Sequence, residues 1–90
     1  MAGITDNSAQ QRFELVESGH TAYADYRRET GLLTILYVFA PPELRGSGAA
    51  GRLMQGIMEQ AEADGVKVQP VCGYAAKWIE RHKDFARLLA

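Results

Sequence analysis

Several residue types that define whole classes of protein are scarce in this sequence. Cys72 is its single cysteine, which excludes an internal disulfide framework and a metal site built from several cysteines, and which suits a reducing compartment. The sequence has only two histidines and no metal-ligand spacing, so we expect no bound metal. The formal net charge is −1, and nothing therefore indicates a nucleic-acid or membrane-surface partner.

Long hydrophobic runs are missing as well. None approaches the roughly 20 residues that a membrane span requires, and residues 1–11 show neither the basic nor the apolar region of a signal peptide. The expected location is therefore the cytoplasm. Ninety residues are enough for one small domain. We expect that domain at residues 12–90, with residues 1–11 as a disordered N-terminal tail.

The first half of the chain carries the pattern of β-strands. Apolar and polar residues alternate over residues 12–17 and 20–28, on either side of a Ser-Gly turn, which predicts an antiparallel hairpin. Residues 32–40 form an almost unbroken apolar run rich in β-branched and aromatic side chains. Such a run predicts a central strand that is buried on both faces.

The second half changes to a helical period. Apolar residues recur at helical spacing from Gly48 to Gly65, and residues 66–71 have the pattern of a second buried strand. A helix between two such strands predicts that residues 32–40 and 66–71 run parallel. A second helix is predicted over residues 74–82, and a final helical turn over residues 83–90. The expected fold is an α+β fold with a mixed sheet, in the order β-β-β-α-β-α-α.

The stretch RGSGAAGR, which begins at Arg45, fits three phosphate-binding patterns. Its three glycines, Gly46, Gly48 and Gly51, match the dinucleotide pattern G-x-G-x-x-G, and the basic residue after the third also approaches a P-loop. Arg45-x-x-Gly48-x-Ala50 matches the pyrophosphate-binding turn of acetyl-CoA-dependent acetyltransferases. In each case backbone N–H groups at a helix N-terminus would attract the anion. The alternative is that the glycines only shape a tight strand-to-helix turn.

Two of these patterns fail in context. The dinucleotide pattern requires its first glycine directly after a strand and an acidic residue at the end of the next strand. Here residues 41–45 intervene, and residues 69–72 carry no carboxylate. The P-loop requires Lys and then Ser or Thr to hold phosphate and Mg²⁺, whereas this chain has Arg52 and Leu53. The acetyltransferase pattern remains.

This turn, between a buried strand and an amphipathic helix, resembles that of the GNAT superfamily of N-acetyltransferases. The segment from Pro70 to Tyr74, which reads Pro-x-Cys-x-Tyr, and the later pair Arg81-His82 are similar to the smallest, YidJ-like branch. The resemblance covers residues 13–89. It implies an acyl-CoA N-acyltransferase-like fold, in which two parallel strands splay apart to admit acetyl-CoA.

The resemblance also assigns residues to the cosubstrate, acetyl-CoA. The backbone of Val38, Phe39 and Ala40 would hydrogen-bond its pantetheine arm, as an added strand would. The turn would hold the pyrophosphate through the backbone of Arg45, Gly46, Ser47, Gly48, Ala49 and Ala50.

Three residues are candidates for the chemistry. Cys72 would carry the acetyl group as a nucleophile or line the site, although a lone cysteine is also typical of a small buried hydrophobe. Tyr37 stands where this branch commonly has a histidine, and it suits a hydrogen-bond donor rather than a base, or a core aromatic. Tyr74 would donate to the departing sulfur of CoA, or only pack at the helix start. His82 matches a histidine of the branch but also suits a structural role at a helix end.

The resemblance implies an enzyme that moves an acetyl group from acetyl-CoA to an amine, directly or through Cys72. The acceptor stays open among a protein lysine, an N-terminus and a small amine. So short a chain leaves little material to cover the thioester, and the alternative is therefore a non-catalytic module that binds CoA or acyl-CoA. An open sheet edge is compatible with a monomer or a weak homodimer.

Overall fold

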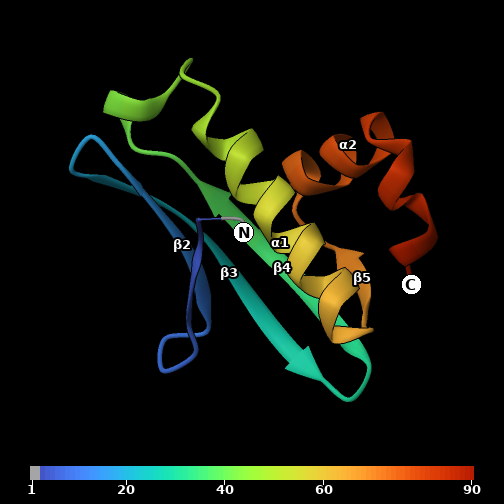
Figure 1. Cartoon of the computed structure of the whole chain (residues 1–90). Coiled ribbons are helices and arrows are strands. Elements are labelled where there is room, and N and C mark those ends of the chain that lie inside the picture. The colour runs from blue at the N-terminus through green and yellow to red at the C-terminus, as the bar shows by residue number, and fades with distance from the viewer. Residues whose placement is uncertain (1–2) are drawn as a thin grey trace.

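The computed structural model describes residues 3–90 as one mixed sheet with helices packed against it (Figure 1). The strands are neighbours in chain order, and β1 to β4 are antiparallel while β5 runs parallel to β4. Their bounds are β1 (Thr5–Asn7), β2 (Arg12–Glu17), β3 (His20–Glu29), β4 (Leu32–Phe39) and β5 (Lys67–Pro70). The helices are α1 (Ala49–Asp64) and α2 (Gly73–Arg81), with 3-10 helices η1 (Pro42–Leu44) and η2 (Lys83–Leu88). The predicted α+β fold and its parallel strand pair are confirmed.

The hairpin of β2 and β3 follows from its turn and its alternation. Ser18 and Gly19 both have positive φ, 51° and 76°, as a two-residue turn that matches the twist of the flanking strands requires. One face of the hairpin is buried in the core, through Phe13, Leu15, Ala22, Ala24 and Tyr26. The other face carries the polar residues that alternate with them.

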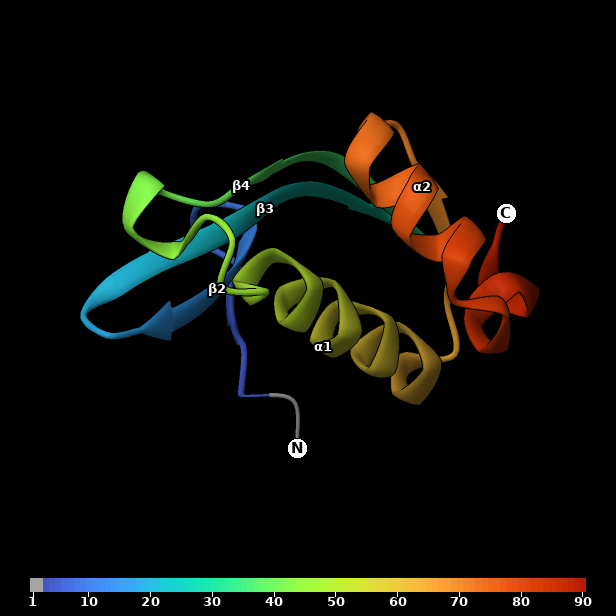
Figure 2. The same cartoon turned by 90° about the horizontal axis from the view of Figure 1, so that it is seen from above.

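Helix α1 covers this buried face of the sheet (Figure 2). Gly48 and Gly65, which flank it, are both in the left-handed conformation, and the Gly65 N–H donates to the carbonyls of Ala61 and Glu62 as in a glycine C-cap. Its apolar stripe is fully buried, through Leu53, Met54, Ile57, Met58 and Ala61. Because α1 connects two parallel strands across this face, its N-terminus lies next to the end of β4.

The N-terminal segment differs from the disordered tail that we expected. Thr5–Asn7 forms β1, which pairs with β2. The Asp6 carboxylate accepts a hydrogen bond from the Tyr26 hydroxyl and pairs with Arg28. Local sequence patterns do not predict these contacts, because they join residues about twenty positions apart. Residues 1 and 2 of the expected tail lie outside the described residues.

The C-terminal segment packs along the outer edge of β5. Leu89 forms a parallel bridge with Val68, and the Ala90 N–H donates to the Val68 carbonyl over 2.9 Å. Phe85 and Leu88 of η2 are buried. The chain itself therefore occupies part of the sheet edge that the sequence had suggested was open.

Candidate functional site

Strand β4 pairs with β5 only along its first half. Their register runs from Leu32 opposite Lys67 to Ile35 opposite Pro70. The last two hydrogen bonds, from the N–H groups of Val71 and Cys72, both end on the Ile35 carbonyl, over 2.9 and 3.2 Å. After Ile35, β4 continues to Phe39 alongside β3, while the other chain turns into α2. The two strands therefore open into a V with Ile35 at its apex.

A β-bulge lies at the apex of this V. Tyr26 of β3 is opposite Ile35, whereas the preceding residue, Asp25, is opposite Tyr37. Leu36 is therefore the extra residue of β4. A bulge bends its strand and increases the local twist, and β4 consequently turns away from β5 at this point.

Pro70 contributes less to the opening than its lack of an N–H suggests. The N–H groups of Lys67 and Val71 donate to the β4 side, to the carbonyls of Gly31 and Ile35. Because N–H groups alternate in direction along a strand, the nitrogen of Pro70 faces the outer edge of the sheet. The proline therefore withholds no donor from β4.

Exposed apolar side chains surround the mouth of the V. Leu36 and Tyr37 of β4 are 37% and 49% exposed, and Val71 and Tyr74 on the opposite side are 60% and 43% exposed. Single apolar residues are ordinary on a protein surface, but a group around one opening is typical of a binding site. Cys72 lies between the last two as the N-cap residue of α2, half-buried and packed against the core.

A cavity of about 260 Å³ lies where the end of β4, the N-terminus of α1 and the first turn of α2 meet. It is lined by Ala40, Leu44, Arg45, Gly46, Gly48, Ala49, Ala50, Gly51 and Tyr74. Five of the six residues predicted for the pyrophosphate line this cavity, and so does Ala40. Leu44 and Gly51 are additions. A Cβ on Gly51 would lie 3.5 Å from Trp78 Nε1 and 4.0 Å from the Tyr74 hydroxyl, so this glycine faces α2.

The first turn of α1, which follows the glycine turn (residues 45–48), leaves backbone N–H groups available at the cavity. Gly46 and Gly48 have φ of 81° and 87°, a conformation that side chains other than glycine rarely adopt. The first intrahelical hydrogen bond runs from the Arg52 N–H to the Gly48 carbonyl. The N–H groups of Ala50 and Gly51 precede it and have no intrahelical acceptor. They combine with the positive end of the helix dipole into a site that suits an anion.

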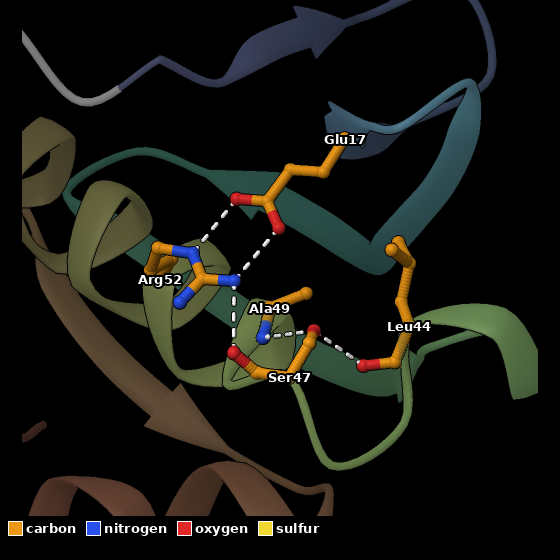
Figure 3. A network of polar contacts seen from close by, with 5 residues as sticks. All are labelled: Glu17, Leu44, Ser47, Ala49 and Arg52. Carbon is orange, nitrogen blue, oxygen red and sulfur yellow. Dashed lines mark hydrogen bonds and ion pairs between the residues drawn. The ribbon is translucent and has the colours of Figure 1, made fainter.

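The Ser47 hydroxyl forms two hydrogen bonds to the backbone on either side of it in the turn (Figure 3). Its hydroxyl donates to the Leu44 carbonyl over 2.6 Å and accepts from the Ala49 N–H over 3.3 Å. The hydroxyl thus satisfies the N–H of the first residue of α1, two positions on, in a local turn that serine side chains commonly form. Ser47 is the one predicted pyrophosphate residue that does not line the cavity, and its side chain supports the turn instead.

Arg45 brings a positive charge to the cavity. Its Nε donates to the Ala40 carbonyl over 2.9 Å, and its guanidinium lies 5.8 Å from the centre of the Phe39 ring. The side chain therefore folds back across the end of β4. Arg45 is exposed, so the guanidinium stays accessible to a ligand in the cavity.

The three predicted catalytic residues do not share one pocket. Tyr74 lines the cavity. Burial raises the pKa of its phenol, Arg81 lowers it and Cys72 raises it further, so the phenol keeps its proton at neutral pH. Tyr37, opposite Asp25, points to the sheet face away from α1. There it lies 6.5 Å from the ring centres of Tyr23 and Phe39.

The predicted residues Val38 and Phe39 likewise lie on opposite faces of the sheet. Val38 packs against the core on the α1 side, whereas Phe39 belongs to the aromatic group on the other face. His82 Nδ1 lies 2.7 Å from the Trp78 carbonyl, and the two rings stack with centres 3.6 Å apart. These contacts with Trp78 fit the structural role that the sequence suggested for His82.

Two classes of feature are missing from the part of the chain that the structure describes. Between residues 3 and 90, no group of three or more His, Cys, Asp or Glu side chains is arranged to hold a metal ion. No helix within the same residues has both the length and the apolar character that a membrane crossing requires.

Comparisons with known proteins agree with this geometry. A family model described as GCN5-related N-acetyl-transferase matches residues 12–88. No curated protein sequence matches the chain at a significant level. Among solved structures, the chain is similar to the solution structure of a GCN5-like protein from Staphylococcus aureus, with a TM-score of 0.75 and 19% identity. The match covers 100% of this chain and 91% of the other.

Proposed function

Because the chain belongs to the GCN5-related N-acetyltransferase family, we propose that it transfers the acetyl group of acetyl-CoA to an amine. The observation that carries the proposal is the cavity at the N-terminus of α1, beside the V between β4 and β5. A phosphate-binding turn next to an opening between strands suits a ligand with a pyrophosphate at one end and a thioester at the other.

The pyrophosphate would bind in the glycine turn. The free N–H groups of Ala50 and Gly51 and the helix dipole supply donors and positive potential without a metal ion. Arg45 lines the same cavity and would add a guanidinium, which pairs well with phosphate oxygens. Gly46 and Gly48 allow the positive φ with which the backbone turns its N–H groups toward the cavity.

The pantetheine arm would extend along the open half of β4. Beyond Ile35, the pairing between β4 and β5 has ended, so the backbone from Val38 to Ala40, at the end of β4 and just after it, faces the opening. The amide groups of pantetheine can pair with such an edge as an added strand does. The thioester would then reach the apex, where Leu36, Val71 and Cys72 surround it.

The chemistry would be a direct attack of the amine on the thioester carbonyl. The new C–N bond forms as the C–S bond breaks, backbone N–H groups at the bulge polarise the carbonyl oxygen, and the amine proton leaves to water. Tyr74, whose phenol is protonated at neutral pH, would give its proton to the departing CoA thiolate. Cys72 would line the thioester. Tyr37 would donate a hydrogen bond to the substrate from the sheet face away from α1.

The Pro-x-Cys-x-Tyr segment also supports membership of the minimal, YidJ-like branch. The acceptor would be an amine that reaches the exposed mouth, on a protein lysine, an N-terminus or a small molecule. The exposure of Tyr37 and Val71 favours a second candidate as well, a module that binds acyl-CoA without turnover. Acetylation of amines by the purified protein separates the two candidates.

The test is a calorimetric titration with acetyl-CoA of the wild type and of Gly48→Asp. An aspartate at this position is strained by the φ of 87° and would place its Cβ 3.0 Å from Arg52 Nη1, so it disturbs the turn that forms the proposed phosphate site. The matched control is Gly31→Asp, which places the same residue at another glycine of positive φ, in the β3–β4 turn. We expect micromolar binding by the wild type and by Gly31→Asp, and none by Gly48→Asp. If the wild type does not bind acetyl-CoA, the proposal is wrong.

Intact mass spectrometry then tests the route. Direct transfer predicts that no acetylated protein accumulates and that Cys72→Ala retains most of its turnover. A protein mass increased by one acetyl group, lost in Cys72→Ala together with turnover, would replace direct transfer by a two-step route through the cysteine.

A further inference from the structure

The last residue of β2 is joined to α1 by a two-pronged ion pair (Figure 3). Arg52 Nε and Nη2 donate to the two carboxylate oxygens of Glu17, each over 2.7 Å. Two parallel hydrogen bonds of this kind fix the plane and the direction of the guanidinium, which a single contact does not. The hydrogen bond from Arg52 lowers the pKa of Glu17, so the pair is fully ionised at neutral pH.

The same guanidinium also holds the glycine turn. Arg52 Nη2 donates to the Ser47 carbonyl over 3.1 Å. In a trans peptide the C=O of one residue and the N–H of the next point in opposite directions. Fixing the Ser47 carbonyl toward Arg52 therefore fixes the Gly48 N–H away from it. Gly48 lines the cavity, so this peptide unit presents its donor, and not its acceptor, to an anion there.

Arg52 also packs directly against Gly48. A Cβ on Gly48 would lie 3.0 Å from Arg52 Nη1, closer than side chains ordinarily approach. The guanidinium thus lies on the outer side of the turn and supports both residues of one peptide unit.

A second contact joins the same hairpin to the other side of the turn. His20 begins β3, and its Nδ1 lies 3.9 Å from a carboxylate oxygen of Glu43 in η1. The end of the β2–β3 hairpin therefore contacts the chain both before and after the glycine turn.

From these contacts we propose that Glu17 and Arg52 are positioning residues, which orient the Ser47–Gly48 peptide so that its N–H meets the phosphates of acetyl-CoA. The proposal rests on the proposed function and adds to it a pair of residues outside the motif. Arg52 acts through the backbone of the turn, and Glu17 acts through Arg52. An exposed ion pair contributes little to stability, so the main effect of the pair is on the ligand.

The direction in which the Kd for acetyl-CoA changes in Glu17→Ala distinguishes a positioning role from a purely electrostatic one. Glu17→Ala removes a negative charge near a site for a polyanion, and long-range electrostatics alone would therefore tighten binding. Positioning predicts the opposite, because Arg52 loses its anchor and the Ser47–Gly48 peptide becomes free to turn. We expect the Kd for acetyl-CoA to rise about fivefold in Glu17→Ala, which corresponds to about 1 kcal/mol.

The matched control is Glu62→Ala. Glu62 forms an ion pair with Arg87 near the opposite end of α1, and this pair is more exposed than that of Glu17, so this variant removes the same charge from a surface pair away from the turn. We expect its Kd for acetyl-CoA to stay within about twofold of the wild type. Arg52→Lys keeps the charge without the planar fork, and its Kd should rise as in Glu17→Ala.

The experiment is a set of calorimetric titrations of these variants with acetyl-CoA and with S-acetylpantetheine, which has the thioester but no phosphates. Thermal unfolding of each variant confirms that it is folded. Weaker binding of acetyl-CoA alone, in Glu17→Ala and Arg52→Lys, supports the proposal. Unchanged or tighter binding in Glu17→Ala, or an equal loss for S-acetylpantetheine, overturns it while the proposed function stands. Failure of the wild type to bind acetyl-CoA overturns both.

Discussion

The two halves of β4 belong to one strand and one apolar run, but they have opposite environments. Leu33, Thr34 and Ile35 lie between β3 and β5 and are at most 1% exposed. The next two residues, Leu36 and Tyr37, are 37% and 49% exposed, because the pairing with β5 has ended. Hydrophobic side chains of similar size thus stabilise the core in the first half and surround an opening in the second.

The difference begins at a single extra residue. The bulge at Leu36 bends β4 away at the level where β5 ends on the Ile35 carbonyl. The paired half therefore fixes where the open half begins. A change in the first half should act mainly on stability, and a change in the second half mainly on the ligand.

The largest expected effect contrasts two neighbouring residues. Ile35→Ala removes a fully buried side chain, and we expect the free energy of unfolding to fall by about 2–5 kcal/mol. Leu36→Ala removes a half-exposed side chain one position later, and its cost should stay below about 1 kcal/mol. Urea denaturation measures both. Equal losses would mean that the two halves of β4 contribute alike to the core.

The second prediction concerns the mouth. Tyr74→Phe removes the hydroxyl that would protonate the departing thiolate, and we expect kcat to fall by about tenfold or more. The Kd for acetyl-CoA should not change, since the ring remains in the cavity wall. Steady-state kinetics and calorimetry give the two quantities separately. A full kcat in this variant would remove Tyr74 from the mechanism.

The third prediction returns to the paired half. The hydroxyl of Thr34 is buried and has no hydrogen-bond partner among the described residues, and the side chain is 1% exposed. Thr34→Val keeps the shape and removes the unsatisfied group, so the free energy of unfolding should rise by about 1 kcal/mol. Thermal or urea denaturation checks the sign. A destabilised Thr34→Val would show that the hydroxyl makes a favourable contact, for example with water.

The smallest expected effect is on the alkaline pH dependence of stability. It compares Tyr26, in the paired strands, with Tyr74, at the mouth of the V. Burial, followed by the hydrogen bond to Asp6, raises the pKa of Tyr26, and burial raises that of Tyr74. The folded state holds both phenolic protons more tightly than the unfolded chain does. Their contribution to stability is therefore complete below about pH 10 and is lost as the pH rises through the folded pKa.

Tyrosine-to-phenylalanine variants separate the two contributions. Tyr26 is 3% exposed and Tyr74 is 43% exposed, so Tyr26→Phe should flatten the alkaline loss of stability more than Tyr74→Phe. Denaturation between about pH 8 and pH 11 measures the slopes. A larger effect of Tyr74→Phe than of Tyr26→Phe would contradict the inference that burial is greater in the paired strands than at the mouth of the V.

The sequence predicted those parts of the fold that depend on local periodicity. Strand alternation, the helical stripe from Gly48 to Gly65 and the spacing of Arg45, Gly48 and Ala50 each involve neighbours along the chain. The strand pair and the position of the turn were therefore predictable. Periodicity cannot indicate which residue of an apolar run becomes a bulge, and by its pattern alone Leu36 is an ordinary strand residue.

Contacts between distant residues could not be predicted in the same way. Strand β1 depends on pairing with β2 and on the contact of Asp6 with Tyr26. Glu17 and Arg52 are thirty-five positions apart, and each alone resembles a solvated surface charge. The separation of Tyr37 from Tyr74 follows from the face to which the bulge turns the Tyr37 side chain, which no spacing in the sequence records.

An NMR titration of the labelled protein with acetyl-CoA tests the contrast within β4, because it reports on each half of the strand separately. We expect large amide shifts at Val38, Phe39 and the glycine turn, and only small shifts at Leu33 and Ile35. Saturating acetyl-CoA that leaves the open half of β4 and the turn unperturbed, or that shifts residues elsewhere instead, would contradict that expectation.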